Sequence, residues 1–274
     1  MRLKVSLFLF IAALCAGTAA SGQSNPKQPV TIDDFVAHRY FQPVFPIWRP
    51  DGMAFAYVEK GAVRLYDIQS RESRVWFETA ALKKAAKKPP AAARKLHNWQ
   101  DRNVAPETYE WFPNGKDLLA CVNGALFIVH PSGKFERLSK NIVHAGEAKL
   151  SPDGKLVLYR VKSNLYVLDL AAKKTRQLTS DGTATLLNGE LDWVYPEELD
   201  LPTAMWWSPD SKKIAYLQFN IGGEFEYPHA DLLGKRAISE PERYPQAGTP
   251  NAKVRLGVAS AEGGATKWIK AGDS

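Results

Sequence analysis

LSPDGKLVLY, residues 150–159, predicts a strand end, a tight turn and a second strand, and the chain repeats this pattern three more times. Proline presets φ at the first central position of such a turn, and Asp or Asn bonds its own backbone. Glycine then takes the positive φ that other residues avoid. The other copies of the turn, each followed by an apolar run, are WRPDG at 48–52, WFPNG at 111–115 and WSPDS at 207–211.

The segments after each turn are also alike. Asn123-Gly124 joins two apolar runs, 118–122 and 125–129, and Asn-Gly is the strongest short signal for a β-hairpin. In the unit that LSPDG begins, residues 165–170 and 175–179 predict two further strands. Four-stranded units that recur at this scale indicate the blades of a β-propeller. A two-sheet sandwich is the alternative, but it does not require the same turn at the same place in every unit.

We therefore predict an all-β fold, an incomplete β-propeller of about four to five antiparallel blades. The last predicted strands are 254–260 and 267–269, so the sequence ends inside a blade. The uneven spacing of the turns places insertions in two units. Residues 80–103 are rich in Lys and Ala and predict a solvated helix–loop excursion. Residues 188–201 break the strand pattern, and we predict a short helical insertion there that carries a Glu-Glu pair.

Composition excludes several classes of protein. Hydrophobic residues make up 45% of the 274 residues, which excludes a disordered chain, and two cysteines exclude a disulfide scaffold. Much of the net charge of +7 lies in the Lys/Ala-rich stretch and forms no stripe interleaved with aromatic residues, so we expect no nucleic-acid partner. The histidines show no metal-ligand spacing, and we expect neither a metal nor another cofactor.

The first residues have the pattern of a secretory signal. Arg2 and Lys4 precede an apolar core at 5–14, which is too short to span a bilayer, and small residues come after it. We predict a signal peptide at 1–20, a lead-in with a short helix at 21–44 and the partial propeller at 45–274. The protein is then exported, to the periplasm or outside the cell. Cys15 leaves a lipid-anchored alternative, which the bulky Leu14 before it disfavours.

The second insertion places two carboxylates side by side. Proline is tolerated in the first turn of a helix and acidic residues are favoured there, so we predict one or two helical turns over 196–201. Glu197 and Glu198 then fan about 100° apart and converge on one cation. An ammonium offers three donors and relieves the repulsion between the two carboxylates. The alternative is an ordinary, solvated helix start without a function.

The residues around this pair resemble the dipeptidyl peptidase IV family of serine exopeptidases. The resemblance covers roughly 109–267, and more loosely the chain from Phe35 onward. The motifs that carry it, in order, are DWVY at 192–195, Glu197-Glu198, WWSPD at 206–210, IAYLQFN at 214–220 and RYPQAGTPNAKV at 243–254.

The resemblance implies a fold and a role. Members of the family have an N-terminal eight-bladed propeller and a C-terminal α/β-hydrolase domain, with the substrate between them. Their double-glutamate motif holds the free N-terminal ammonium of a peptide, which sets the cut after the second residue, usually proline or alanine. Glu197 and Glu198 match these glutamates position by position. The implied partners are a peptide with a free N-terminus, the hydrolase domain and a second copy in a homodimer.

Three features depart from the family's pattern. Pro196 stands where a third glutamate is common, and the short turn at Asn123-Gly124 has no arginine to hold the substrate carbonyl. The chain contains no Gly-x-Ser-x-Gly motif, so we assign no catalytic residue. We therefore expect the N-terminal recognition propeller of an exported peptidase that removes Xaa-Pro or Xaa-Ala dipeptides, truncated before its catalytic domain and inactive alone.

Two alternatives stay open on the sequence. One is a stand-alone exported propeller that binds peptides or proteins, because a fold does not fix a function. The other is a family member whose hydrolase domain has lost its nucleophile.

Overall fold

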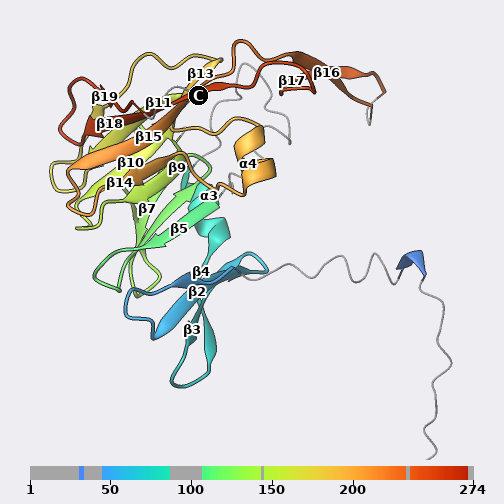
Figure 1. Ribbon diagram of the computed structural model, residues 1–274. Coiled ribbons are helices and arrows are strands. Elements are labelled where there is room, and N and C mark those ends of the chain that lie inside the picture. The colour runs from blue at the N-terminus through green and yellow to red at the C-terminus, as the bar shows by residue number, and fades with distance from the viewer. Residues whose placement is uncertain (1–30, 34–44, 87–106, 143–144, 233–234, 271–274) are drawn as a thin grey trace, which may run out of the picture. The chain divides into compact units, whose positions relative to one another are not determined.

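The computed structural model describes residues 31–33, 45–86, 107–142, 145–232 and 235–270 (Figure 1). The predicted signal peptide at 1–20 and Cys15 lie outside these residues, as does the lead-in at 21–44 except for 31–33. The chain divides into two units, Met1–Pro43 and Val44–Ser274. All the described strands belong to the second unit.

The second unit is built from antiparallel sheets, as the sequence predicts. The first sheet contains β1 (Ile47–Trp48), β2 (Ala54–Glu59), β3 (Ala62–Asp67) and β4 (Ser73–Glu78). The second contains β5 (Glu107–Trp111), β6 (Leu118–Val122), β7 (Ala125–Val129) and β8 (Phe135–Arg137). The third contains β9 (Ala145–Leu150), β10 (Leu156–Val161), β11 (Asn164–Asp169) and β12 (Lys174–Gln177).

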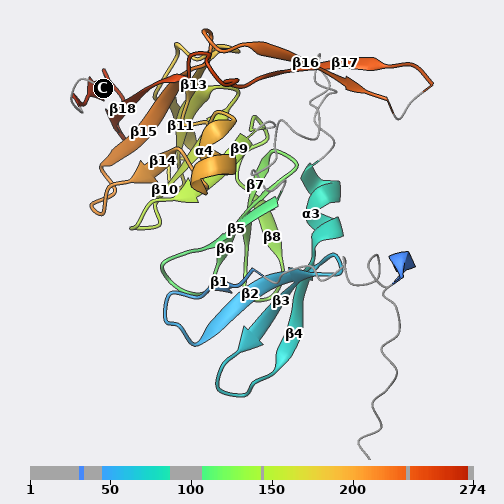
Figure 2. The same ribbon diagram turned by 45° about the vertical axis from the view of Figure 1, so that its right-hand side comes forward.

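The fourth sheet differs because two short strands share one edge. It contains β13 (Leu186–Asn188), β14 (Met205–Trp207), β15 (Lys213–Asn220), β18 (Lys253–Ser260) and β19 (Lys267–Trp268). Both β13 and β14 pair with β15, one after the other along its length. A two-stranded ribbon of β16 (Glu226–Asp231) and β17 (Ile238–Arg243) extends away from the sheets (Figure 2).

The predicted turns stack on one another from sheet to sheet. A Cβ on Gly115 would lie 3.6 Å from Arg49, and one on Gly154 would lie 2.9 Å from Pro113. The backbone N–H of Asp153 donates to the hydroxyl of Ser211 at 3.0 Å. The repeated turns of successive units therefore meet one another, as blades around a common axis require.

The apolar cores lie between successive sheets. Neighbouring residues of one strand serve different cores, because alternate side chains point to opposite faces. On β6, Leu118 packs toward the first sheet and Leu119 toward the third. On β10, Val157 packs toward the second sheet and Leu158 toward the fourth. A middle sheet buried on both faces contradicts the two-sheet sandwich and confirms the stacked blades.

The inner strands are also joined by hydrogen bonds. The indole N–H of Trp111 donates to the carbonyl of Ile47 at 2.8 Å, and that of Trp207 donates to the carbonyl of Lys149 at 3.2 Å. Both tryptophans come from the repeated turn motif, so the motif joins blades as well as forming turns. The carboxylate of Glu110 accepts from the backbone N–H of Leu150 at 2.8 Å, which joins the second and third blades.

The first insertion differs from the prediction. Helix α3 (Thr79–Ala86) begins it, and residues 87–103 lie outside the described part. The sequence predicts a solvated excursion, but Leu82 and Ala86 are buried in the core between the first two sheets. The apolar residues of an Ala-rich helix recur at positions i and i+4, which places them on one face that packs onto the blades. Among the described helices, none has the length and apolar content needed to cross a membrane.

Candidate functional site

The second insertion leaves and rejoins the inner edge of the fourth sheet at one residue. The backbone N–H of Gly189 donates to the carbonyl of Leu217 at 2.9 Å, and the N–H of Leu217 donates to the carbonyl of Ala204 at 2.9 Å. The excursion at 190–203 is therefore closed at its base. It precedes β14, whose far end leads into the turn WSPDS, so it lies at the blade edge opposite the proline turns.

The excursion contains helix α4 (Val194–Leu199). The carboxylate of Asp192 accepts from the backbone N–H of Tyr195 at 3.0 Å, which satisfies a donor at the start of the helix. Asp200 ends it with a left-handed backbone at φ 50, and its N–H donates to the carbonyl of Tyr195. The helix is as short as predicted, but it begins and ends two residues before the predicted range of 196–201 because Asp200 stops it.

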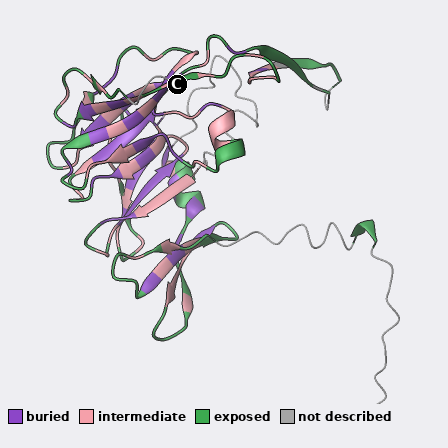
Figure 3. Cartoon of the chain, viewed as in Figure 1, coloured by how far each residue is buried: buried purple, intermediate pink, exposed green. Residues whose placement is uncertain are grey.

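Two aromatic contacts hold α4 against the fold. Tyr195 packs edge-on against Phe219, with ring centroids 4.8 Å apart. Trp193 lies 5.2 Å from Tyr244, at the end of the β16–β17 ribbon. These contacts anchor the first turn of α4, and Glu197 and Glu198 in its second half are exposed. Figure 1 shows α4 standing off from β14 and β15, and Figure 3 colours the residues at one end of the helix as exposed.

A buried polar network lies at the base of the excursion. The side-chain amide of Asn188 donates to Asp181 at 2.8 Å and to the carbonyl of Ser163 at 3.1 Å. Gln218 donates to Asn188 at 2.7 Å and to Asp181 at 3.0 Å, and accepts from Arg255 at 2.7 Å. The network ties the third blade to the fourth at the point where the excursion begins.

A second acidic pair lies at the base of α4. Asp192 and Glu224 are both buried. Burial raises the pKa of Asp192, and hydrogen bonds from the backbone of Tyr195 and Val194 oppose the rise. Burial, and then the charge of Asp192, raise the pKa of Glu224 to about 7. No sequence pattern singles out Glu224, because a lone glutamate after Gly222-Gly223 is typical of an exposed turn.

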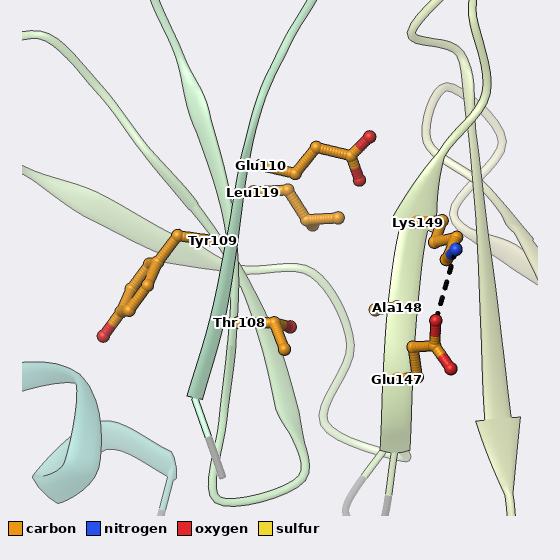
Figure 4. Close-up of a pocket in the computed structure, with 7 residues that line it drawn as sticks. All are labelled: Thr108, Tyr109, Glu110, Leu119, Glu147, Ala148 and Lys149. Atoms are coloured by element: carbon orange, nitrogen blue, oxygen red, sulfur yellow. Dashed lines mark ion pairs between the residues drawn. The ribbon is translucent and has the colours of Figure 1, made fainter. Parts of the chain in front are cut away.

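The described cavities lie elsewhere. A groove of about 290 Å³ separates β5 from β9 (Figure 4). Thr108 and Glu110 point across it toward an ion pair between Glu147 and Lys149, at 3.2 Å. A shallower hollow of about 460 Å³ lies among the proline turns. Glu197 and Glu198 line neither of them.

The turn at Asn123-Gly124 and the histidines have structural surroundings. The turn has φ of 48 and 74 and joins β6 to β7 over the predicted ranges. His130 lies 2.8 Å from Asp117, and His229 lies 3.3 Å from Glu242; the other histidines lie outside the described residues. Within the described ranges, no group of three or more His, Cys, Asp or Glu side chains is arranged to hold a metal ion.

The chain is similar to known proteins over most of the described residues. The model of the family "Dipeptidyl peptidase IV (DPP IV) N-terminal region" matches residues 122–274, more than half of the chain. Dipeptidyl aminopeptidase B of Saccharomyces cerevisiae is 32% identical over 186 residues, which are 62% of this chain and 22% of that protein. A probable dipeptidyl-aminopeptidase B of Podospora anserina is 37% identical over 122 residues, 40% of this chain and 13% of that protein.

The solved structures agree on the fold. The crystal structure of Porphyromonas gingivalis dipeptidyl peptidase 4 superposes with a TM-score of 0.69 at 20% identity. The match covers 90% of this chain and 36% of that one. The chain thus spans about a fifth of the yeast relative and about a third of the bacterial one.

Proposed function

Because the chain belongs to the dipeptidyl peptidase IV N-terminal region family, we propose that it is the substrate-recognising part of a peptidase that removes N-terminal dipeptides. Glu197 and Glu198 bind the free ammonium of the peptide. Residues 45–274 form part of a propeller that works with an α/β-hydrolase domain, which supplies the serine nucleophile. The observation that carries the proposal is the placement of both glutamates on an anchored, capped helical turn whose acidic half is exposed.

The geometry of α4 suits this task. Adjacent residues of a helix point about 100° apart, so two neighbouring carboxylates reach the same cation from two sides. An ammonium donates three hydrogen bonds, and bonds between charged partners are about twice as strong as neutral ones. The excursion is closed at its base by the two backbone hydrogen bonds of Leu217. We infer that this closed base sets the distance from the ammonium to the nucleophile of the hydrolase domain. Binding energy at the amine end then sets the bond that is cut.

The location and the assembly belong to the same proposal. A signal peptide at 1–20 directs the protein out of the cytoplasm, where peptides with free N-termini are its substrates. The peptidase acts as a homodimer. We assign no metal or other cofactor to the reaction, because serine peptidases use a side-chain nucleophile with a general base.

A peptide titration tests the proposal on the full chain. The probe is Ala-Pro-Ala with a free N-terminus, followed by NMR chemical shifts of the isotope-labelled protein. Glu197→Gln and Glu198→Gln should each weaken binding about tenfold, because each removes a charge-assisted hydrogen bond. The shift changes in the wild-type chain should centre on α4.

The matched control is Glu72→Gln, the same chemical change at an exposed residue of the first sheet's β3–β4 turn. This variant should bind the peptide like the wild type. Equal affinity for the wild type and both α4 variants would reject the role of the pair.

A further inference from the structure

Arg160 is a buried cation near the end of β10. Its side chain is 10% exposed, and its Nε–H is buried without a hydrogen-bond partner among the described residues. Its Nη1 atom pairs with the carboxylate of Glu190 at 2.8 Å and donates to the backbone carbonyl of Lys162 at 3.2 Å. A buried guanidinium is costly unless a carboxylate compensates its charge, so Arg160 depends on Glu190 staying where it is.

A bulge between β9 and β10 makes room for this side chain. The register of the two strands shifts by one residue between Tyr159 and Val161, so Gly146 and Glu147 both stand opposite Arg160. A Cβ on Gly146 would lie 3.1 Å from Nη2 of Arg160, so the glycine leaves the space that the guanidinium fills. Bulges re-aim side chains and are common next to active sites.

The hairpin turn that follows β10 receives the residues from which the excursion starts. The hydroxyl of Ser163 in this turn donates to the carboxylate of Glu190 at 3.4 Å. The backbone carbonyl of Ser163 accepts from the backbone N–H of Asn188 at 3.2 Å. The third blade therefore holds the chain at the point where it leaves the fourth sheet.

Glu190 begins the arm that leads to α4. The next residue, Leu191, packs against the cluster around Phe219, and Asp192 then caps the helix by accepting from Tyr195. The aromatic contacts of α4 are made to β15 of the fourth sheet and to the end of the β16–β17 ribbon. The ion pair of Glu190 adds a link from the same arm to the third blade.

We propose that Arg160 is a positioning residue for α4: it holds Glu190 and thereby fixes the arm of the excursion, residues 190–193, to the third blade. Without this ion pair the arm keeps its contacts to the fourth sheet but moves more freely against the third, and the cap of α4 opens more often. The part of this inference that concerns substrate rests on the proposed role of Glu197 and Glu198.

Hydrogen exchange of the Tyr195 amide tests the link between Arg160 and α4 without a ligand. NMR on the full chain compares the wild type with Arg160→Met at one pH. The side chain of Glu190 is 31% exposed, so water solvates its carboxylate when the guanidinium is gone, and the variant should fold. The Tyr195 amide should exchange about threefold faster or more, because the cap that it donates to opens more often.

The amide of Val167, buried in β11 of the same blade as Arg160, is the internal reference. Its exchange should change by less than about twofold, because only the excursion is loosened. Equal acceleration of Tyr195 and Val167 would show a general loss of stability and would overturn the inference, as would an unchanged rate at Tyr195.

Two further arginine variants complete this comparison. Arg160→Lys keeps the positive charge but not the planar fork of donors, so its Tyr195 rate should lie between those of the wild type and Arg160→Met. Arg74→Met makes the same chemical change at an exposed residue of β4 and should behave like the wild type.

Gly146→Ala tests the inference where Arg160→Met does not fold, because it leaves both charges in place. Its added Cβ pushes on the guanidinium, and the Tyr195 amide should exchange about twofold faster or more. Gly223→Ala is the matched control, since a Cβ there meets open space, and it should exchange like the wild type. Equal Tyr195 rates in the two alanine variants would contradict the inference.

A peptide titration separates this inference from the proposed function. Arg160→Met should weaken the binding of Ala-Pro-Ala about threefold or more, because the helix that binds the amine is no longer held in one position before binding. Unchanged affinity in this variant, with binding that still requires Glu197 and Glu198, would overturn the role of Arg160 alone. If the Tyr195 rate changes as expected and N-acetylation of the peptide leaves its affinity unchanged, the proposed function fails and the link between Arg160 and α4 stands.

Discussion

At the scale of single residues, Asn188 holds together the buried network under the excursion. Its replacement by leucine leaves Asp181 and Gln218 buried with fewer partners than their groups require. We expect Asn188→Leu to lower the free energy of unfolding by about 2–4 kcal/mol, measured by urea denaturation. Asn141→Leu, at an exposed position, should change it by less than about 0.5 kcal/mol. Equal losses in the two variants would contradict the structural role of the network.

Cys121 offers a second test at this scale. Burial raises the pKa of its thiol to about 12, so little thiolate forms at ordinary pH. The thiol also points to the carbonyl of Gly146 at 3.4 Å, inside the core between the second and third sheets. Iodoacetamide at about pH 8 should alkylate Cys121 slowly in the folded chain and rapidly in urea, as followed by peptide mass spectrometry. Rapid alkylation without denaturant would show that this core is open.

At the scale of elements, the turns can be compared with one another. Gly52 and Gly154 occupy equivalent turns, with φ of 71 and 70. A Cβ on Gly52 meets open space, but one on Gly154 lies 2.9 Å from Pro113. Gly52→Ala should lower the free energy of unfolding by about 1–2 kcal/mol, because of backbone strain alone. Gly154→Ala should lower it by at least about 1 kcal/mol more, because its Cβ also meets Pro113. Equal thermal stability of the two variants would contradict the contact between successive turns.

Most of the strands could be predicted, because their signals are local. Strands β6 and β7 match the predicted ranges, since the Asn-Gly turn sets where β6 ends and where β7 begins. The position of α4 is predictable only to within two residues. Its end depends on the left-handed backbone of Asp200, which the aspartate residue type only weakly signals. The buried face of α3 is not predicted, because its Lys-rich sequence suggests solvent on all sides.

The candidate site was predictable only in part. Glu197 and Glu198 adjoin each other in the sequence, so their pairing on one turn comes from local structure. Glu224 could not be found in this way. The charge of Asp192 acts on it only because the fold brings residues 192 and 224 into one region, and a proximity set by tertiary structure leaves no pattern in either segment.

At the scale of the whole molecule, Glu224 affects stability as pH changes. Its pKa is about 7 in the folded chain against an ordinary value of 4.5. Below that ordinary value both states hold the proton. Between the two values only the folded chain holds it, so the free energy of unfolding should fall as pH rises, by at most about 1.4 kcal/mol per pH unit.

The comparison of the wild type with Glu224→Gln isolates this effect from the other carboxylates. Hydrogen bonds from Arg49 and Ser151 lower the pKa values of Asp51 and Asp153. The stability that these two carboxylates add to the folded chain is therefore lost only at more acidic pH. Urea unfolding of both chains between about pH 4.5 and 7.5 should give curves that diverge, with the variant less sensitive to pH. Parallel curves would show that Glu224 does not hold its proton in the folded chain.

Recognition of a free peptide amine by the pair on α4 underlies the whole proposed function, and a thermodynamic cycle isolates it. The affinities of Ala-Pro-Ala and its N-acetyl form are measured for the wild-type chain and for the chain with both Glu197→Gln and Glu198→Gln. A coupling of about 1.5–3 kcal/mol between the amine and the carboxylates is predicted, as for hydrogen bonds to charged groups. A coupling of zero, with acetylation costing both chains the same, would contradict amine recognition by the pair.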